Sequence, residues 1–184
     1  LKKFLPTFIN HSTPDAEIVL IDNNSNDKSI ELVENKYPQI SIIKLEKNYG
    51  FAGGYNRGLK QLGHKYFILV NSDIEVSKNW INPLIEQLRS DSTISVVQPK
   101  ILNQNKKDEF EYAGAAGGYI DLLAYPICKG RIFTNIEKDK GQYENNYEIF
   151  WSSGACMAIK AVDFLEVDGF DDDFFAHMEE IDLC

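Results

Sequence analysis

Long apolar segments are missing from this sequence. It contains no run of roughly 18 to 20 apolar residues, the length that a helix needs to cross a lipid bilayer. It also contains no segment with the charged, apolar and small-residue regions of a signal peptide. Both absences argue against an integral membrane protein, and we expect the chain itself to be soluble.

Cysteine is scarce as well. Cys128, Cys156 and Cys184 are odd in number and widely spaced along the chain. A disulfide framework or a structural zinc site needs cysteines that are paired or closely spaced, so the sequence predicts neither. The few histidines stand in no recognisable Ser-His-Asp or Cys-His motif, which argues against a hydrolase with a serine or cysteine nucleophile.

Positive charge is also in short supply. Lysine and arginine number 19 against 28 acidic residues, which gives a net charge of -9 and a pI near 4.8. Proteins that bind nucleic acid hold its phosphate backbone with clustered Lys and Arg, so we expect no nucleic acid partner. An acidic protein that binds nucleotide phosphates is instead expected to use a divalent cation.

Short strands and helices are predicted to alternate over the first hundred residues. Apolar runs predict strands over residues 16–21, 40–45, 66–70 and 95–102, with helices over residues 1–10 and between the strands. This alternation implies an α/β fold with a mostly parallel, doubly wound sheet and helices on both faces. Residues 103–146 lack the pattern and are expected to form an irregular excursion over the sheet. A strand over residues 149–159 and a helix over residues 161–167 follow, and we expect residues 1–184 to form a single domain.

The most informative stretch is YFILVNSDIE, at residues 66–75. Its apolar run ends abruptly at Asn71, Ser72 and Asp73, as expected of a buried parallel strand that delivers polar groups to its carboxyl end, where open α/β sheets bind ligands. The alternative is an Asx turn without a function, because Asn, Ser and Asp are ordinary turn formers. At a ligand site, Asp73 together with a diphosphate would suit a hard cation such as Mg²⁺ or Mn²⁺.

A glycine-rich segment, KNYGFAGGYNRG, occupies residues 47–58. Its glycines let the backbone approach a ligand closely, but the spacing matches neither a Rossmann dinucleotide loop nor a P-loop. Further acidic residues end or follow predicted strands at Asp22 and at Glu179, Glu180 and Asp182. Strand ends in such a sheet converge on one crevice, so these carboxylates can face one ligand. A carboxylate of the last group can serve as a general base.

Five segments together resemble one known family. They are, in order, IVLIDNNSNDKS, KNYGFAGGYNRG, FILVNSDIEV, WSSGACMAIKA and GFDDDFFAHMEEIDLC. In this order and at similar spacing they resemble the family 2 glycosyltransferases, in particular bacterial rhamnosyltransferase-like enzymes that build surface polysaccharides. The resemblance covers almost the whole chain except residues 103–146. It implies a GT-A fold and an inverting transfer of a sugar from a nucleotide-diphosphate sugar donor.

The resemblance also implies roles for particular residues. Asp73 would bind the Mg²⁺ or Mn²⁺ ion, and Asn71 stands in the place of the first acid of a DXD motif. Glu180 falls where the family has the Asp of its Glu-Asp base motif, and Glu179 and Asp182 are the rival catalytic bases. The donor-binding residues implied are Asp22, Asn24, Gly53, Gly54, Asn56, Asn71, Ser72, Ser153 and Gly154.

The partners and the location follow from the same resemblance. The implied acceptor is a saccharide or a lipid-linked saccharide, and the implied location is the cytoplasm, at the inner face of the membrane with peripheral association, although no amphipathic anchor is visible. Family members begin with a further strand that contacts the nucleotide, so we expect this chain to be truncated at both ends. Two other functions stay open, namely a nucleotidyltransferase that makes a nucleotide sugar and a non-catalytic module that binds sugar nucleotides.

Overall fold

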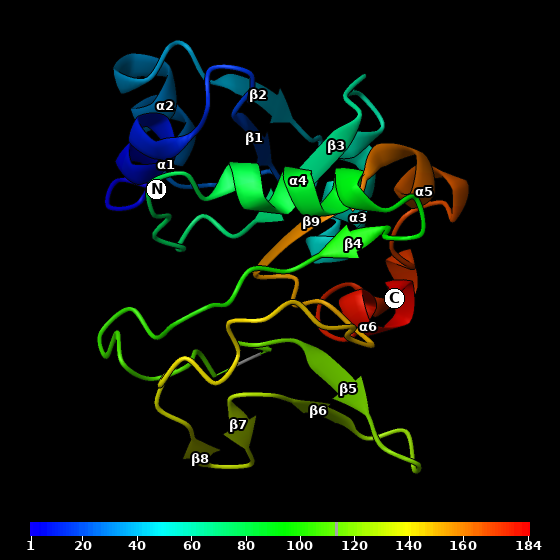
Figure 1. The fold of residues 1–184 in the computed structure, drawn as a ribbon. Helices are drawn as coiled ribbons and strands as arrows, with labels where there is room; N and C mark the ends of the chain where they lie inside the picture. The colour runs from blue at the N-terminus through cyan, green and yellow to red at the C-terminus, as the bar shows by residue number, and fades with distance from the viewer. Residues whose placement is uncertain (113) are drawn as a thin grey trace.

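The computed structural model describes residues 1–112 and 114–184, and its first hundred residues alternate between strands and helices as predicted (Figure 1). The elements there are α1 (Leu5–His11), β1 (Val19–Asp22), α2 (Ser29–Lys36), β2 (Ser41–Lys44), α3 (Gly50–Leu59), β3 (Tyr66–Val70), α4 (Ile81–Ser90) and β4 (Val96–Val97). The C-terminal part adds β9 (Cys156–Lys160), α5 (Ala161–Glu166), the 3-10 helix η1 (Asp172–Phe174) and α6 (Glu179–Leu183). No helix in the two described ranges is both long enough and apolar enough to cross a membrane.

The strands of this main part form two sheets. β1 and β2 pair in parallel, with Val19 opposite Ser41 and Asp22 opposite Lys44. β9 lies between β3 and β4 and runs antiparallel to both. The predicted parallel arrangement is therefore confirmed only in part, because the hydrophobic pattern of a strand carries no information about its direction. β9 is also shorter than the strand predicted over residues 149–159. The residues before it bond elsewhere, Phe150 and Trp151 to the backbone of Gly118 and Ser153 to the side chain of Gln98.

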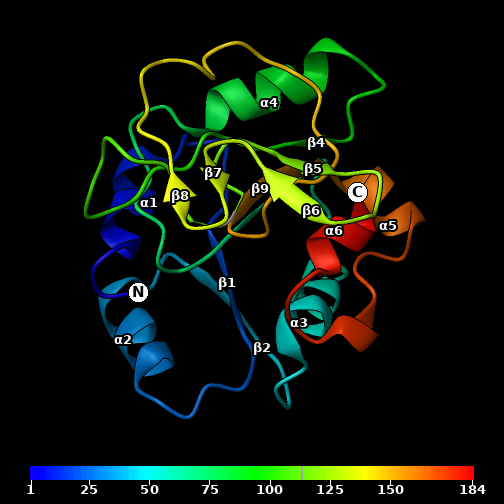
Figure 2. The same cartoon turned by 90° about the horizontal axis from the view of Figure 1, so that it is seen from below.

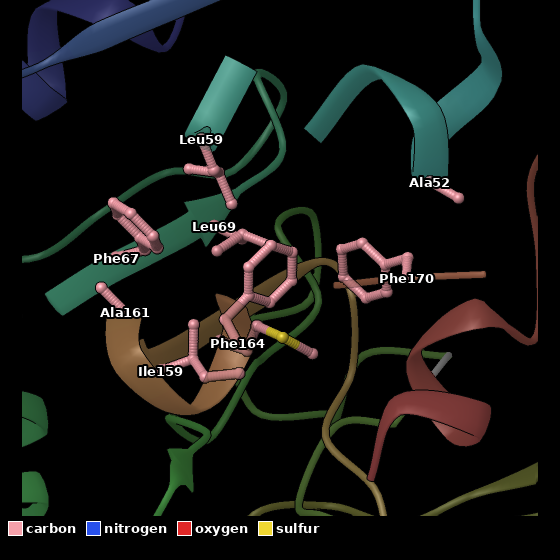
Figure 3. Packing of buried hydrophobic residues seen from close by; sticks show 9 residues of the cluster. Ala52, Leu59, Phe67, Leu69, Ile159, Ala161, Phe164 and Phe170 are labelled. Carbon is pink, nitrogen blue, oxygen red and sulfur yellow. The ribbon is translucent and has the colours of Figure 1, made fainter. Parts of the chain in front are cut away.

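Helices cover both faces of the sheet that contains β9, as predicted. On one face, β3 and β9 pack with α3 and α5 (Figure 3). The buried side chains there are Ala52, Leu59, Phe67, Leu69, Met157, Ile159, Ala161, Phe164 and Phe170. On the other face, Ala158 packs with Leu84 and Leu88 of α4. Successive side chains of a strand alternate between the faces of a sheet, so β9 serves both helical layers at once.

A third group of contacts covers β1 and β2. Leu5 of α1 and Val33 of α2 pack with Ile40, just before β2. α3 approaches β1 at Gly58, where a Cβ atom would collide with the side chain of Ile21. Glycine at this position therefore permits close helix–strand packing. The contact sets α3 against β1 next to the end of that strand.

Residues 103–146 contain a small antiparallel sheet in their described part, where the sequence predicted an irregular excursion. Its strands, paired in chain order, are β5 (Gly118–Ile120), β6 (Pro126–Cys128), β7 (Arg131–Ile132) and β8 (Asn135–Ile136). This sheet lies at one end of the molecule in Figure 1 and faces the viewer in Figure 2. Strands of two or three residues are too short to show an alternating pattern, which is why the sequence did not predict them.

β1 and β3 belong to different sheets, and both border one open cleft of about 930 Å³. All four residues of β1 line this cleft, together with Tyr66, Phe67, Ile68 and Val70 of β3. Side chains of the neighbouring helices, including Leu59 of α3 and Ile85 of α4, also line it. The edges of β1 and β3 that face the cleft pair with no described strand, so their N–H and C=O groups are left to bond water.

We expect the amide hydrogens of β1 and β3 that face this cleft to exchange faster than those that face β2 and β9. One hydrogen bond contributes about 1 kcal/mol net, so the difference should be about fivefold or more. Hydrogen exchange followed by NMR measures this residue by residue in the 184-residue chain. Equal protection on both edges of β3 would show that the cleft edge is paired in solution.

Candidate functional site

The carboxyl ends of β1 and β3 meet at this cleft. Asp22 at the end of β1, Gly54 on α3, and Asn71 and Ser72 after β3 all line it. These four predicted donor-binding residues come from three segments that lie far apart in the chain. Open α/β sheets bind ligands in the crevice beyond the carboxyl ends of their strands, so this cleft is the candidate site.

The end of β1 presents a buried acid. Asp22 is 9% exposed, and its carboxylate accepts a hydrogen bond from the backbone N–H of Ser25 at 3.1 Å. Asn24 has a φ of 60°, a left-handed conformation that asparagine tolerates, and it is exposed to solvent. Asp22 therefore belongs to the wall of the cleft, whereas Asn24 lies in the exposed loop beside it.

Asn23 is a residue of this site that the sequence did not single out. Its Nδ2 donates to the Asn48 side chain at 3.0 Å and to the Gly50 carbonyl at 2.7 Å, and its Oδ1 accepts from the Tyr49 N–H at 2.9 Å. A Cβ atom on Gly54 would lie 3.0 Å from this side chain. Asn23 therefore fastens the glycine-rich segment to the end of β1. In the sequence, only the two consecutive asparagines after the strand could have pointed to this role of Asn23.

The turn after β3 carries the candidate metal-binding acid. Ser72 and Asp73 are exposed, and the N–H of Asn71 donates to the Ala155 carbonyl at 3.0 Å, which joins this turn to the loop before β9. Within residues 1–112 and 114–184, no group of three or more His, Cys, Asp or Glu residues is placed to hold a metal ion. The chain thus has no preformed cage in its described part. A single exposed carboxylate at Asp73 still fits Mg²⁺ or Mn²⁺, because such cations take further ligands from a diphosphate and water.

The acidic segment near the C-terminus forms α6. Glu179 is only 4% exposed, and the Oε2 atoms of Glu179 and Glu180 are buried without a hydrogen-bond partner among the described residues. Burial raises the pKa of the Glu179 carboxyl, and the charge of Glu180 adds to the rise. Asp182 is exposed. Carboxylates with unused oxygens can accept a proton from a bound hydroxyl group.

The loop before β9 connects the acidic segment with the cleft. A Cβ atom on Gly154 would lie 3.2 Å from the Phe51 ring and 3.9 Å from the Cβ atom of Glu180, and Phe51 also lines the cleft. Ser153 is buried, and its N–H donates to the Gln98 side chain at 2.7 Å. Glu180 and the cleft are therefore neighbours through Gly154 and Phe51.

The two remaining donor-binding candidates, Gly53 and Asn56, lie on another side of α3. A Cβ atom on Gly53 would lie 3.4 Å from the Asp172 side chain, and the Asn56 amide hydrogen-bonds Phe170 and Asp172. Gly54, by contrast, lines the cleft. The structure therefore does not bring Gly53 and Asn56 together with the residues at the strand ends.

We expect Glu179→Gln to stabilise the fold at neutral pH. The pKa of Glu179 is raised in the folded state, so its favourable contribution is fully present below the unfolded value of about 4.3 and is lost as the pH rises through the folded value. A neutral amide removes the cost of burying the charge, about 1 kcal/mol or more, which corresponds to a Tm increase of roughly 2 to 4 °C.

Thermal unfolding of this variant at about pH 7.5 and about pH 3.5 measures the effect, and we expect the gain only at the higher pH. Glu166→Gln, at an exposed position of α5, is the matched control. A Tm that does not rise at the higher pH would contradict the prediction.

Comparison with known proteins identifies the family of this chain. The model of the family described as glycosyl transferase family 2 matches residues 1–166. The N-acetylglucosaminyl-diphospho-decaprenol L-rhamnosyltransferase of Mycobacterium tuberculosis is 23% identical over 201 aligned residues, which cover 100% of this chain and 64% of that protein. The chain therefore spans less than two thirds of the length of this relative.

Solved structures share the fold. GalNAc-T7, solved with UDP, GalNAc and Mn²⁺, has a TM-score of 0.69 at 18% identity, and the match covers 98% of this chain and 36% of that one. The mannosyltransferase PcManGT from Pyrobaculum calidifontis, solved with GDP-Man and Mn²⁺, has a TM-score of 0.65 at 13% identity, with 99% and 46% covered. Both are GT-A glycosyltransferases, so the predicted GT-A fold is confirmed. Because the family model matches most of its length, the chain belongs to glycosyl transferase family 2.

Proposed function

We propose that this chain is part of an inverting glycosyltransferase, which moves a rhamnosyl or another hexosyl group from a nucleotide-diphosphate sugar to a hydroxyl group of a saccharide or a lipid-linked saccharide. The observation that carries the proposal is the cleft at the strand ends with buried carboxylates beside it. Family membership supports the transfer chemistry. The name of the mycobacterial relative supports the rhamnosyl group and the lipid-linked acceptor.

The donor binds at the end of the cleft where β1 and β3 finish. Asp22 binds the nucleoside, because it is a buried acid on the cleft wall with one hydrogen bond to its own turn. Asn71 and Ser72 face the diphosphate, and Gly54 lets the backbone of α3 come close to it. The UDP and GDP-Man in the two solved relatives support a donor of this class.

Asp73 would hold the Mg²⁺ or Mn²⁺ ion that the donor diphosphate needs. When bound, the cation neutralises the negative charge that develops on the departing nucleotide diphosphate. The Mn²⁺ in both solved relatives supports this role. A single protein carboxylate implies that the ion binds weakly until the donor supplies further oxygen ligands.

Glu180 acts as the general base on the acceptor side. It takes the proton of the acceptor hydroxyl group, and the oxygen forms a bond to the anomeric carbon of the donor sugar. The bond from this carbon to the diphosphate oxygen breaks, and its electron pair leaves with the nucleotide diphosphate. A single displacement from the opposite face inverts the anomeric centre. Ser153 and Gly154 border the sugar between this base and the cleft, and Glu179 and Asp182 are the rival bases.

Calorimetric titration of the complete protein with nucleoside diphosphates, with and without Mn²⁺, tests the donor site. A donor hydrolysis and transfer assay with the matching nucleotide sugar then tests the chemistry. Binding that Mn²⁺ strengthens, followed by release of the nucleoside diphosphate, supports the transferase. Pyrophosphate release from a nucleoside triphosphate and a sugar phosphate would identify a nucleotidyltransferase instead. Binding without turnover of any donor would identify a non-catalytic module.

We further propose that residues 1–184 act as one transferase domain of a longer protein in the cytoplasm, at the inner face of the membrane. The lipid-linked acceptor in the name of the mycobacterial relative supports this location. Co-sedimentation of the complete protein with lipid vesicles tests the peripheral association, and recovery of all the protein in the supernatant would count against it.

A further inference from the structure

The connection between α5 and α6, residues 169–178, is anchored to α3. The carbonyl of Phe175 accepts hydrogen bonds from the N–H groups of Phe51, at 2.6 Å, and Ala52, at 3.3 Å. These N–H groups belong to the first turn of α3, where a helix offers them no internal partner. A Cβ atom on Gly50 would collide with the same carbonyl, so glycine lets the connection come this close. The start of α3 therefore fixes the second half of the connection.

Asn56 fixes the first half of this connection. It is 6% exposed, and its Nδ2 donates to the Phe170 carbonyl at 2.7 Å and to Asp172 Oδ1 at 2.8 Å, while its Oδ1 accepts from the Phe170 N–H at 2.9 Å. Arg57 donates to the other Asp172 oxygen at 2.8 Å. One buried amide thus bonds both backbone groups of Phe170 and one side chain, across more than a hundred residues of sequence.

The connection has an unfavourable backbone conformation directly before the acidic residues. Phe175, His177 and Met178 have φ values of 56°, 77° and 75°. Residues other than glycine incur a steric cost in this region and adopt it only where the surrounding structure holds them there. Glu179 follows as the first residue of α6. The direction in which α6 presents its carboxylates therefore depends on the contacts that hold this turn.

We infer that Asn56 is a positioning residue, which holds the connection so that its turn presents Glu180 to Gly154 and the cleft. Its amide is already bonded to the chain, and a Cβ atom on Gly169 would collide with its Oδ1. It is also absent from the residues that line the cleft. Asn56 acts through Phe170 and Asp172 and does not touch the donor. The effect on catalysis rests on the proposed function, whereas the effect on the connection does not.

The test compares Asn56→Asp, the double variant Asn56→Asp with Asp172→Asn, and Gln61→Ala in the complete protein. Asn56→Asp keeps the size of the side chain, removes the donor to the Phe170 carbonyl and sets a second negative charge against Asp172. The double variant restores one donor and one acceptor between positions 56 and 172. Gln61, just after α3, is exposed and bonds the Arg57 carbonyl, and its replacement is the control.

For Asn56→Asp we expect kcat to fall about 30- to 100-fold, because a small displacement of a catalytic group costs about this much, while Kd for the nucleoside diphosphate changes less than about twofold. Hydrogen exchange followed by mass spectrometry should show faster exchange over residues 175–183 than in the unmodified protein. The exchange of β1 and β3 should be unchanged. The double variant should recover part of both effects, and Gln61→Ala should change neither. General destabilisation would accelerate exchange everywhere and would not split kcat from Kd.

If exchange over residues 175–183 is unchanged in Asn56→Asp, the inference is overturned. This readout does not require that the protein transfer any sugar. Weaker nucleotide binding with kcat retained also overturns it, because Asn56 would then be a donor-binding residue. If the unmodified protein transfers no sugar while exchange over residues 175–183 responds as expected, the proposed function fails and the positioning role is supported.

Discussion

Replacing Asp73 by alanine in the complete enzyme is expected to lower kcat for sugar transfer about 100- to 1000-fold, the effect of losing one group that stabilises charge in a transition state. The carboxylate lies on the exposed turn directly after β3, next to the cleft residues Asn71 and Ser72. In the described ranges it belongs to no cluster of metal-ligating side chains. No preassembled set of ligands among the described residues would therefore hold the cation without this carboxylate, and the loss should be large.

Two further variants make this experiment specific. Asp73→Asn removes the charge at nearly constant size, so we expect most of the loss together with a higher Mn²⁺ concentration for half-maximal rate. Glu75→Gln is the control, because Glu75 is bonded to Gln104 at 3.0 Å and to Lys107 at 3.2 Å. Its rate should stay within about twofold of the unmodified enzyme, as is usual for a surface substitution. Near-normal transfer and metal dependence in Asp73→Asn would show that the metal assignment is wrong.

The layers of the fold could be predicted from the sequence because local pattern carries them. The helix α4, for example, repeats apolar residues at Ile81, Leu84 and Leu88, and these are the positions that the structure buries. The direction of β9 could not be predicted, because Cys156–Lys160 reads equally well as a parallel or an antiparallel strand. Strand direction depends on how the chain returns to the sheet, and this is a property of the tertiary structure.

The candidate site could also be predicted only in part. Asp22 and Asp73 were expected to face one crevice because each stands at the end of a predicted strand. The structure brings Asp22 to the cleft together with Asn71 and Ser72, the two residues before Asp73. The glycine-rich segment was harder to interpret, because its residues divide between sides of one helix. Gly54 meets Asn23 at the end of β1, whereas Asn56 meets residues 170–172. Helical periodicity predicts such a division, but only the packed structure shows which partner each side meets.

The acidic segment shows why the general base could not be chosen from the sequence. Glu179, Glu180 and Asp182 lie within four positions, and each has the chemistry of a base. Their environments differ in the structure, since Glu179 is buried, Glu180 is near Gly154 and Asp182 is exposed. Burial raises the pKa of Glu179 and favours its neutral form, which cannot accept a proton. Position next to the cleft therefore favours Glu180.

Glu180→Gln is expected to lower kcat about 100- to 10000-fold, the range that general-base catalysis contributes. The Kd for the nucleoside diphosphate should remain within about twofold, because the Gln side chain keeps its packing near Gly154 and the nucleotide is bound at the ends of β1 and β3. Glu180→Asp should recover part of the rate, since a carboxylate one methylene shorter keeps the chemistry and loses only reach. Steady-state kinetics and calorimetry on the same preparations separate the two quantities.

Parallel measurements on Glu179→Gln and Asp182→Asn decide between the three acids. Asp182→Asn should have the smallest effect, because its side chain is in solvent. If Glu180→Gln retains its rate and Glu179→Gln loses it, the base is Glu179, and the buried carboxylate with the raised pKa performs the proton transfer. The rate would then fall as the pH drops through that raised pKa, because a protonated carboxyl group cannot accept the acceptor proton. The pH profile thus tests the assignment independently of the size of the kcat loss.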